Sequence, residues 1–384
     1  MPQKRHLRIP MDKTSIIAII IPFFTIKYKC FDDIIFLNFP CFFGMLLTDV
    51  CEFGIIKETV VFYYAAPIIF KKGRMLFMNI YEVLEDIKSD RKKKIILDSD
   101  TYNEMDDQYA IAYALGCDKI DVIGLTAAPF KNGRSTSFAD GMEKSYGEIF
   151  RVLDVTNKTG TCEVLRGADD SISRQPGFAP VDNPASRYII KMAKESDEII
   201  YVLGTGMCTN ITSAILLDPS IKENICVIWL GTNARNVRDV GEFNLNQDYR
   251  AGQLLLNSGV PLVIVPCYGE DGHGTVHLNA YGHDLQGIKG DSRACVFFRE
   301  TLPFEFEEES TEGGTEEWFR VIWDIGAPAV LSVPEAMDLS IIPAPVLTEE
   351  RVFAYDDTRH KIIVAGVLDR AKVLADTFAC IGNL

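Results

Sequence analysis

The chain has 384 residues, of which 47% are hydrophobic, so it is long enough to bury the core of one large domain or two ordinary ones. Its formal net charge of −15 argues against a nucleic-acid partner, because an acidic surface repels phosphates. The same charge is compatible with a neutral small-molecule substrate or with a bound cation.

The first 78 residues differ from the rest of the chain. Residues 1–74 carry 10 Lys and Arg against 6 Asp and Glu, and they are rich in Ile, Phe and Tyr. Their apolar run at 16–24 follows a basic start, as in a signal peptide, but it is too short to span a membrane and no clean cleavage site follows. Three interpretations stay open: a start codon assigned too far upstream (with Met75 or Met78 as the true start), a targeting or membrane segment, and a genuine structural extension. We therefore divide the chain into an atypical extension, 1–78, and a main domain, 79–384.

The cysteines of the main domain are scattered, without a CxxC pair or a zinc-type spacing. Several lie in apolar runs, as Cys226 does, where a buried free thiol is the expected state. We therefore expect a cytoplasmic protein whose main domain has no membrane partner. The extension leaves secretion or membrane anchoring open.

From residue 79 onward, short apolar runs typical of buried strands alternate with segments typical of helices. We predict strands at 94–97, 121–126, 199–203, 226–230, 262–265, 352–355 and 362–365. We predict helices at 106–115, 141–153, 185–195, 209–217, 318–331 and 369–380, and an acidic loop at 303–317. This alternation predicts one α/β domain with a mostly parallel central sheet flanked by helices on both faces, which is a Rossmann-like fold.

Five acidic residues follow the first predicted strand of the main domain, at the end of the sheet where open parallel sheets bind their ligands. They are Asp98, Asp100, Glu104, Asp106 and Asp107. Acids this close repel one another unless a cation or hydrogen bonds offset their charge, and oxygen-rich clusters favour Ca²⁺ or Mg²⁺. Acids also stabilise the start of a helix, but that alternative accounts only for the last two members.

Two kinds of enzyme begin with such a pattern. Phosphatases of the haloacid dehalogenase type carry Asp-x-Asp-x-Thr after a strand, whereas here Thr101 comes one place early and Tyr102 occupies the threonine position. An aspartyl phosphatase therefore stays only as an alternative.

Over about residues 93–335 the chain resembles the inosine–uridine preferring nucleoside hydrolase family. The resemblance rests on motifs in the family's order: Asp98-Ser-Asp100, Asp106-Asp107, the segment 124–132 with Asn132, the turn from Leu203-Gly-Thr205 to Asn210, Glu242-Phe-Asn244, and Trp323-Asp324. The loop 101–105 is two residues longer than the family's common version.

The resemblance implies the nucleoside hydrolase fold and hydrolysis of the N-glycosidic bond of a ribonucleoside to ribose and free base. It implies Ca²⁺ as the cofactor, with a Ca²⁺-bound water that gives its proton to Asp100. The implied Ca²⁺ ligands are Asp100, Asp107, the backbone carbonyl of Thr205, and Asp324. The implied substrate-binding residues are Asp106, Asn132, Glu242, Asn244 and Trp323. We further expect a homo-oligomer.

The chain departs from the family at Trp323, where well-known members carry a histidine that protonates the departing base. Tryptophan cannot act as an acid, although it can stack on a base. His273 and His277 are the candidates for a replacement acid, and the preferred base stays open. The loss of the acid also leaves a non-catalytic nucleoside- or ribose-binding protein as an alternative function.

Overall fold

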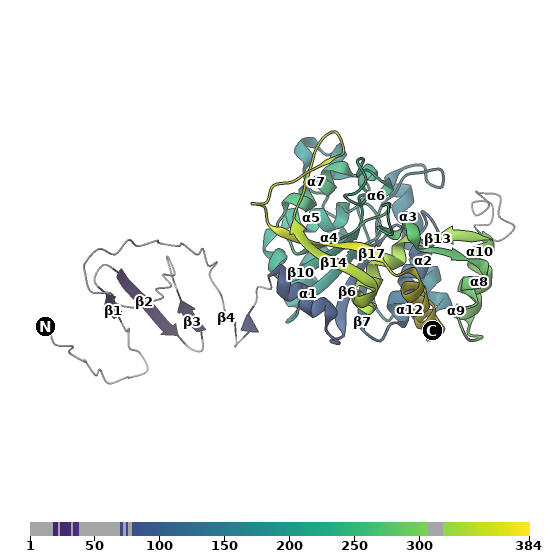
Figure 1. Cartoon of the computed structure of the whole chain (residues 1–384), viewed down its shortest axis with the longest axis horizontal. Coiled ribbons are helices and arrows are strands. Elements are labelled where there is room, and N and C mark those ends of the chain that lie inside the picture. Colours follow the sequence, from purple (N-terminus) through teal and green to yellow (C-terminus); the bar gives the residue numbers. More distant parts are fainter. Residues whose placement is uncertain are drawn as a thin grey trace. The chain divides into compact units, whose positions relative to one another are not determined.

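The computed structural model describes the backbone of five short strands between residues 18 and 75 and, with side chains, residues 79–305 and 318–384. Contacts between Cα atoms divide the chain into two units, Met1–Met78 and Asn79–Leu384. In the first unit β1 (Ala18–Ile21), β2 (Phe24–Phe31) and β3 (Ile34–Leu37) form an antiparallel sheet, and β4 (Phe70–Lys71) pairs with β5 (Arg74–Met75) (Figure 1). The apolar run at 16–24, on which the interpretations of the extension depend, lies outside the residues whose side chains are described.

An eight-stranded sheet forms the centre of the second unit, in the order β14-β17-β11-β10-β9-β6-β7-β8 (Figure 1). Its strands are β6 (Lys93–Ser99), β7 (Ile120–Ala127), β8 (Glu163–Arg166), β9 (Ile200–Gly204), β10 (Ile225–Leu230), β11 (Leu262–Val265), β14 (Met337–Pro343) and β17 (Lys361–Leu368). Every neighbouring pair is parallel except β14 and β17. The predicted mostly parallel sheet is therefore confirmed.

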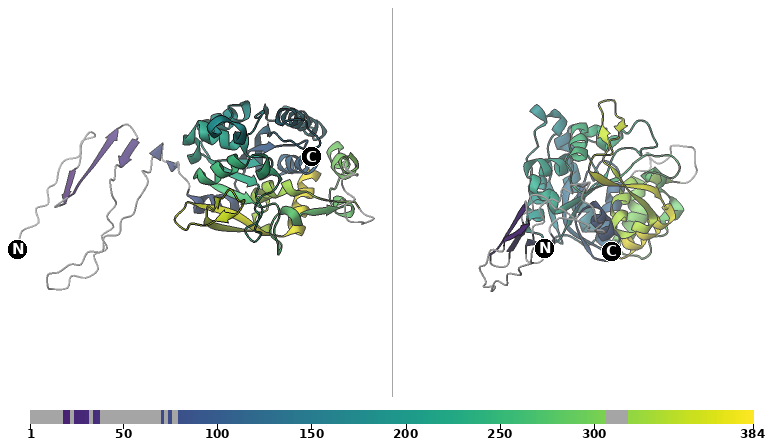
Figure 2. Two further views of the ribbon diagram at one scale, coloured as in Figure 1. Left: turned by 90° about the horizontal axis from the view of Figure 1, so that it is seen from above. Right: turned by 60° about the vertical axis from the view of Figure 1, so that its left-hand side comes forward.

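The helices form two packed groups around this sheet. Helices α4 (Pro184–Glu195), α5 (Thr209–Leu217) and α7 (Tyr249–Asn257) pack against one another, and their buried residues share a core with β9, β10 and β11. Helices α1 (Ile80–Lys88), α2 (Asp106–Gly116), α11 (Gly326–Ser332) and α12 (Arg370–Gly382) form a second group, and α3 (Phe138–Val155) packs beside α2. In Figure 2 the teal α4 and α5 lie on the far side of the molecule from the yellow α12, with the sheet between them. Helices on both faces confirm the predicted layers.

The direction of the strand connections reverses between β6 and β9. From β6 the chain proceeds outward through β7 to β8, and from β9 it proceeds through β10 to β11 in the opposite direction. The two neighbouring strands therefore diverge into connections on opposite faces, and the crevice at their carboxyl ends is where open α/β sheets bind ligands. The residues that follow β6 and β9 are Asp100 and Thr205.

Short elements complete the second unit. They are α6 (Phe243–Gln247), α8 (Gly282–Leu285), α9 (Arg293–Val296), α10 (Leu302–Glu305), β12 (Asn279–Tyr281), β13 (Phe319–Val321), β15 (Val346–Leu347) and β16 (Phe353–Ala354). The predicted helix 318–331 is wrong over its first part, because 319–321 pair antiparallel with 279–281 and Trp323–Ile325 form a 3₁₀ turn before α11. Most of the predicted acidic loop, 306–317, lies outside the described residues, and α10 precedes it.

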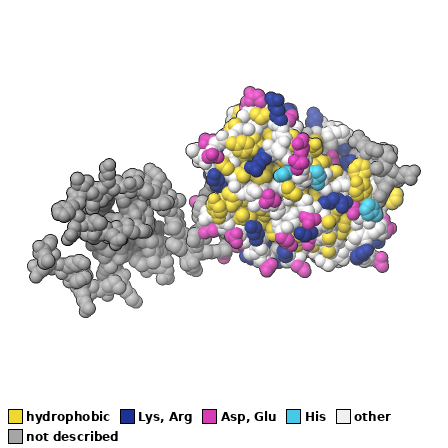
Figure 3. All heavy atoms as spheres, viewed as in Figure 1, with side chains coloured by type: hydrophobic (Ala, Val, Ile, Leu, Met, Phe, Trp, Pro, Cys, Tyr) yellow, Lys and Arg dark blue, Asp and Glu magenta, His cyan; other side chains and the backbone are white. Residues whose placement is uncertain are grey.

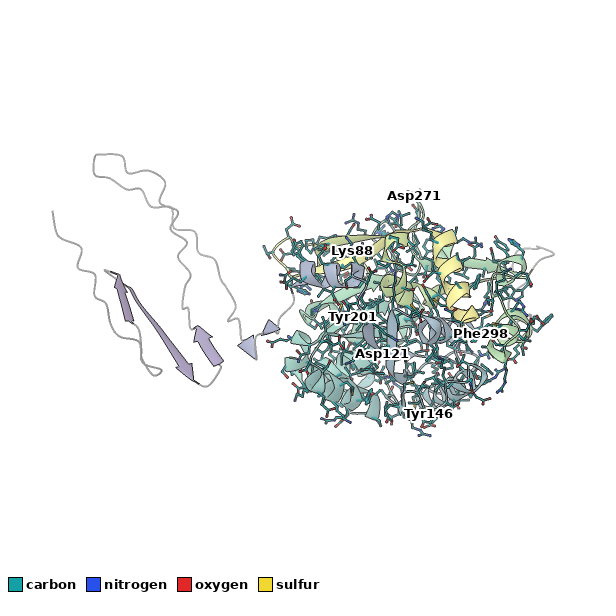
Figure 4. The ribbon with its side chains drawn as sticks, turned by 90° about the horizontal axis from the view of Figure 1, so that it is seen from below. Lys88, Asp121, Tyr146, Tyr201, Asp271 and Phe298 are labelled. Atoms are coloured by element: carbon teal, nitrogen blue, oxygen red, sulfur yellow. The ribbon has the colours of Figure 1, made fainter. Side chains whose placement is uncertain are left out.

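The surface seen in Figure 3 carries acidic, basic and apolar side chains interspersed over the second unit. None of the helices in the described residues has the length and apolar character needed to cross a bilayer. At the amino ends of the strands, away from the crevice, Tyr201 of β9 (Figure 4) donates a 2.7 Å hydrogen bond to Asp86 Oδ2 of α1. Helix α1 is thereby anchored to the sheet.

Candidate functional site

A cavity of about 210 Å³ is lined by residues that end or follow the central strands and by residues at or just before the starts of α2, α6 and α11. Its lining residues are Asp100, Asn103, Glu104, Asp106, Thr205, Leu230, Asn233, Glu242, Phe243, Asn244, Cys267, Tyr268, Trp323 and Asp324. Seven of the predicted site residues are in this set. The two that are absent from it are Asp107, which lies in the acidic cluster described next, and Asn132.

Three buried carboxylates meet at one side of the cavity. Asp106 and Asp107 occupy the first turn of α2, and Asp324 lies in the 3₁₀ turn before α11. Each offers one oxygen atom, and these three atoms all lie within 4.8 Å of one another. An all-oxygen, carboxylate-rich donor set of this kind fits a hard divalent cation.

The Asp100 side chain completes the acidic cluster, and it has no hydrogen-bond partner among the described residues. Asp100 is 1% exposed, and neither of its carboxylate oxygens makes a hydrogen bond within the described part of the chain. Burial, followed by the charges of Asp107 and Asp106, raises the pKa of Asp100 well above its ordinary value. A buried carboxylate without partners is costly, and a cation between these side chains would offset that cost.

The backbone approaches Asp100 closely from the turn after β9. A Cβ atom built on Gly206 would lie 3.0 Å from the carboxylate carbon of Asp100, closer than real Cβ contacts usually allow. The glycine therefore lets the turn that carries Thr205 pack against the carboxylate.

Two hydroxyl groups hold Asp107 in place. Ser99 Oγ and Thr205 Oγ1 donate to Asp107 Oδ1 at 2.6 and 2.9 Å. Burial raises the pKa of Asp107 to about 6, although these hydrogen bonds act in the opposite direction. The carboxylate is thus oriented by neighbours from β6 and from the turn after β9, as expected for a metal ligand supported by surrounding hydrogen bonds.

The carbonyl of Thr205 and the amide of Asn244 face the same region. Asn244 Nδ2 donates to Thr205 O and to Leu230 O, each at 3.0 Å. Both amide hydrogens of Asn244 are therefore committed, and its Oδ1 is the atom left for a ligand. The Thr205 carbonyl keeps a second lone pair, which is sufficient for a cation.

Glu242 forms the N-cap of α6. Its Oε1 accepts from the backbone N–H of Thr232 at 2.9 Å and of Leu245 at 2.7 Å, and its Oε2 accepts from Asn244 N at 2.6 Å. Burial raises the pKa of Glu242, and these three N–H groups oppose that shift. The carboxylate therefore fixes the start of α6 beside the cavity and has lone pairs left for a substrate hydroxyl.

Asp98, the first acid of the sequence motif, does not line the cavity. Its Oδ1 accepts from Thr126 Oγ1 at 2.6 Å and from Asn210 Nδ2 at 2.8 Å. Burial raises the pKa of Asp98 to about 7. Asp98 therefore links β6 to β7 and to α5 beneath the site. Asn210 Oδ1 in turn accepts a hydrogen bond from Ala168 N at 2.8 Å.

Three aromatic side chains line the cavity at partly exposed positions. They are Trp323, Phe243 and Tyr268, of which the last two are 37% and 47% exposed. The lining aspartates Asp100, Asp106 and Asp324, by contrast, are at most 5% exposed. The cavity thus has a charged inner part and an aromatic rim.

Neither of the two candidate histidines lines the cavity. His273 Nδ1 lies 2.9 Å from Glu270 O, and His277 Nε2 lies 3.2 Å from Gly269 O. Asp271, labelled at the edge of the molecule in Figure 4, belongs to the same loop. Both histidines are therefore engaged by their own loop.

Asn132, which was predicted to contact the ribose, contacts another asparagine instead of the cavity. Its Nδ2 donates to Asn103 Oδ1 at 2.6 Å, and Asn103 lines the cavity. Asn103 was not among the residues predicted from the sequence, although the unusual length of loop 101–105 was the available signal. Two further lining residues were not predicted: Phe243, although it lies inside the Glu242-Phe-Asn244 motif, and Tyr268, for which the sequence carries no specific signal.

A doubly wound parallel sheet with clustered carboxylates at its switch point defines a class of α/β proteins that bind a small polar ligand at the carboxyl ends of their strands. Residues 95–377 match the family model of the inosine-uridine preferring nucleoside hydrolases. The chain belongs to this family.

Curated relatives and solved structures agree with this assignment. The pyrimidine-specific ribonucleoside hydrolase RihA of Escherichia coli is 27% identical over 192 residues, which are 44% of this chain and 58% of the relative. The chain thus spans little more than half the length of that relative. A purine-preferring ribonucleoside hydrolase from Gardnerella vaginalis has a similar structure, with a TM-score of 0.60 and 21% identity over 76% of this chain and 98% of the other. An inosine-uridine preferring nucleoside hydrolase from Bacillus anthracis has a TM-score of 0.54 and 14% identity, over 76% of this chain and 100% of the other. At such identities the solved structures establish the nucleoside hydrolase fold.

Proposed function

We propose that the protein hydrolyses the N-glycosidic bond of a ribonucleoside to ribose and free base, with Ca²⁺ as its cofactor. The observation that carries the proposal is the unpartnered carboxylate of Asp100, buried beside the clustered acids of α2 and Asp324. Membership of the nucleoside hydrolase family supports the reaction class. The proposed cation ligands are Asp100, Asp107, the Thr205 carbonyl and Asp324.

The reaction needs a nucleophilic water, support for a positively charged sugar, and a base that can leave. A bound divalent cation supplies a Lewis acid that orients a water and lowers its pKa. Asp100 is the proposed general base, which would accept the proton of the attacking water. The surrounding carboxylates stabilise the positive charge that develops on the sugar.

The inner part of the cavity offers acceptors for the ribose hydroxyls. We assign this task to the Oδ atoms of Asp106, the remaining lone pairs of Glu242 and the Oδ1 of Asn244. A site that hydrogen-bonds substrate hydroxyls rejects analogues that lack them. We therefore expect ribonucleosides to be preferred over deoxyribonucleosides.

The aromatic rim is assigned to the base. Trp323, Phe243 and Tyr268 provide partly exposed ring surface, on which a purine or a pyrimidine can stack. The names of the relatives include both pyrimidine-specific and purine-preferring enzymes. Base preference in this chain would then depend on stacking area, with no imidazole among the lining residues to protonate the base.

The testing experiment is a reducing-sugar assay over a panel of nucleosides with added CaCl₂. We expect ribose release by the wild-type protein and its loss in Asp100→Asn. Asp121→Asn, an acid of β7 outside the cavity (Figure 4), is the matched control and should retain activity. No release of ribose from any nucleoside by the wild-type protein would refute the proposal.

Two other functions make different predictions in the same experiment. A non-catalytic nucleoside-binding protein would bind a nucleoside without releasing ribose, which is consistent with the missing histidine. An aspartyl phosphatase would form a covalent phosphate on Asp98, but this side chain does not line the cavity and is held by Thr126 and Asn210. A homo-oligomer and a cytoplasmic location stay predictions, which light scattering and localisation would check.

A further inference from the structure

Asn103 projects into the cavity from the long loop between β6 and α2. The residue is 9% exposed and lines the cavity together with Asp100 and Asp106. Its backbone N–H donates to Asp100 O at 2.7 Å, so the loop turns back beside the buried acid. This side chain therefore lies where a substrate hydroxyl would meet the acidic cluster.

The hydrogen bonds around Asn132 fix which atoms of both amides face each other. The backbone N–H of Arg134 is only a donor, and it lies 2.8 Å from Asn132 Oδ1. Asn132 must therefore direct its Nδ2 towards Asn103, and the atom that receives it at 2.6 Å must be Asn103 Oδ1. The donor group of Asn103, Nδ2, is left without a hydrogen bond to any residue in the described parts of the chain.

The segment that carries Asn132 is itself braced on two sides. The guanidinium of Arg134 lies 4.8 Å from the ring centre of Tyr102, in the same loop as Asn103. On the other side, Lys131 N donates to Gln247 Oε1 of α6 at 2.8 Å. The position of Asn132, and through it that of Asn103, is thus linked to the helix that carries Asn244.

A donor at this place has a clear chemical use. The inner lining is dominated by carboxylates, which accept the hydrogen of a sugar hydroxyl but cannot donate to its oxygen. The Nδ2 group of Asn103 supplies that missing donor. A hydroxyl held between a carboxylate and this amide would have both of its hydrogen-bonding functions satisfied.

We propose that Asn103 binds a ribose hydroxyl through its Nδ2 group, and that Asn132 is a positioning residue that acts only through Asn103. The proposal rests on the proposed function, because it takes a ribonucleoside as the ligand. It replaces the direct ribose contact that the sequence predicted for Asn132.

The test compares Asn103→Ala, Asn132→Ala and the double variant, with Asn257→Ala, an exposed asparagine at the end of α7, as the control. Loss of one hydrogen bond to substrate should lower kcat/KM about tenfold in Asn103→Ala, and loss of its orientation about threefold in Asn132→Ala. The double variant should be no worse than Asn103→Ala, since the two residues act in series. The proposal would be overturned if the losses of kcat/KM in the two single variants multiplied in the double variant. It would also be overturned if Asn132→Ala alone lowered kcat/KM more than Asn103→Ala.

A second measurement identifies the hydroxyl and controls for misfolding. Against 2′-, 3′- and 5′-deoxynucleosides, Asn103→Ala should lose the wild-type discrimination at one position and keep it at the other two. A folded variant, by circular dichroism, with unchanged discrimination at all three positions contradicts the proposal.

Nucleoside binding by calorimetry separates this inference from the proposed function. If the wild-type protein binds without turnover, and binding weakens about tenfold in Asn103→Ala but not in Asn257→Ala, then hydrolysis fails as the function and the contact of Asn103 stands. Equal binding by the wild-type protein and Asn103→Ala, or no binding by either, overturns the contact.

Discussion

Thr205 Oγ1 donates a 2.9 Å hydrogen bond to Asp107 Oδ1, and this contact joins the end of β9 to the first turn of α2. Thr205→Val removes the donor but keeps the size of the side chain and the backbone carbonyl, whereas Thr205→Ser keeps the donor. We expect the apparent Ca²⁺ affinity to fall about tenfold in the valine variant and to stay near wild type in the serine variant. Thermal unfolding during a CaCl₂ titration measures this, and equal affinities would contradict a supporting role for Thr205.

The unpartnered carboxylate of Asp100 has opposite effects with and without the cation. In EDTA, Asp100→Asn removes a buried carboxyl whose charged form is disfavoured by burial and by its acidic neighbours, so we expect the metal-free protein to be more stable by roughly 1–2 kcal/mol. With saturating Ca²⁺ the order should reverse, because a proposed ligand is lost. Calorimetric melts under both conditions provide the comparison, and the idea fails if the variant is less stable in EDTA as well.

The stability of the metal-free protein should depend on pH in the direction set by its raised carboxyl pKa values. The pKa of Asp107 is raised to about 6 and that of Asp98 to about 7, whereas the ordinary value is 3.8. The folded state therefore binds these protons more tightly than the unfolded state. This contribution to stability is complete below the ordinary value and is lost as the pH rises through the folded values.

We accordingly expect the melting temperature in EDTA to fall between pH 5 and pH 7.5. The increase in melting temperature produced by Ca²⁺ should grow over the same interval, since protons and cation compete for the cluster. Differential scanning fluorimetry with and without CaCl₂ provides both curves. A Ca²⁺ effect that is constant with pH would show that Asp107 does not hold the ion.

Trp323 lines the cavity where the family's well-known members carry an acid, so departure of the base should be the weak step. A nitrophenyl riboside, whose leaving group needs no protonation, should be cleaved much faster than any natural nucleoside. Trp323→Phe keeps an aromatic ring and should change this ratio little, whereas Trp323→His should raise turnover of natural nucleosides selectively. Similar wild-type rates on both kinds of substrate would indicate that another residue protonates the base.

Thr232 has a φ of 66°, an uncommon conformation for a β-branched residue, and it is fully buried after β10. Its backbone donates to Glu242 Oε1, so strain here supports the cap of α6. Thr232→Gly relieves the strain, and Thr232→Ala removes the same side-chain atoms beyond Cβ while keeping the strain. We expect the glycine variant to be about 1 kcal/mol more stable than the alanine variant in urea unfolding, and the reverse order would contradict a strained backbone.

Local patterns predicted the parallel core well. Helix 209–217 and strand 262–265 agree with the structure at both ends, because a Pro after Asp218 and a Pro before Leu262 bound them. Strand β14 was missed, since an edge strand paired antiparallel to β17 is mostly half-buried and lacks a continuous buried run. Strand β13 was predicted as helix, because its pairing with 279–281 depends on residues about forty positions away in the chain.

In the site, too, residues in local sequence motifs could be predicted, whereas residues placed by long-range contacts could not. The sequence motifs located Asp100, Asp106 and Asp324, which the fold brings to one cavity. Which asparagine faces that cavity depended on a contact between two loops, and no local pattern encodes the 2.6 Å bond between Asn132 and Asn103. Of the aromatic rim, the motif located Trp323, whereas Phe243 and Tyr268 come from separate segments and could be recognised only in three dimensions.

The contrast between the buried acids and the partly exposed aromatic rim bears on how this enzyme family could diversify. Exchanging Asp106 or Asp324 disturbs a cluster whose members depend on one another, so such changes carry a cost in both folding and chemistry. Phe243 and Tyr268 are more than one-third exposed, and substitutions at such positions usually alter stability little. New leaving groups can therefore be explored by changing the rim, while the proposed ribose-binding part is inherited intact.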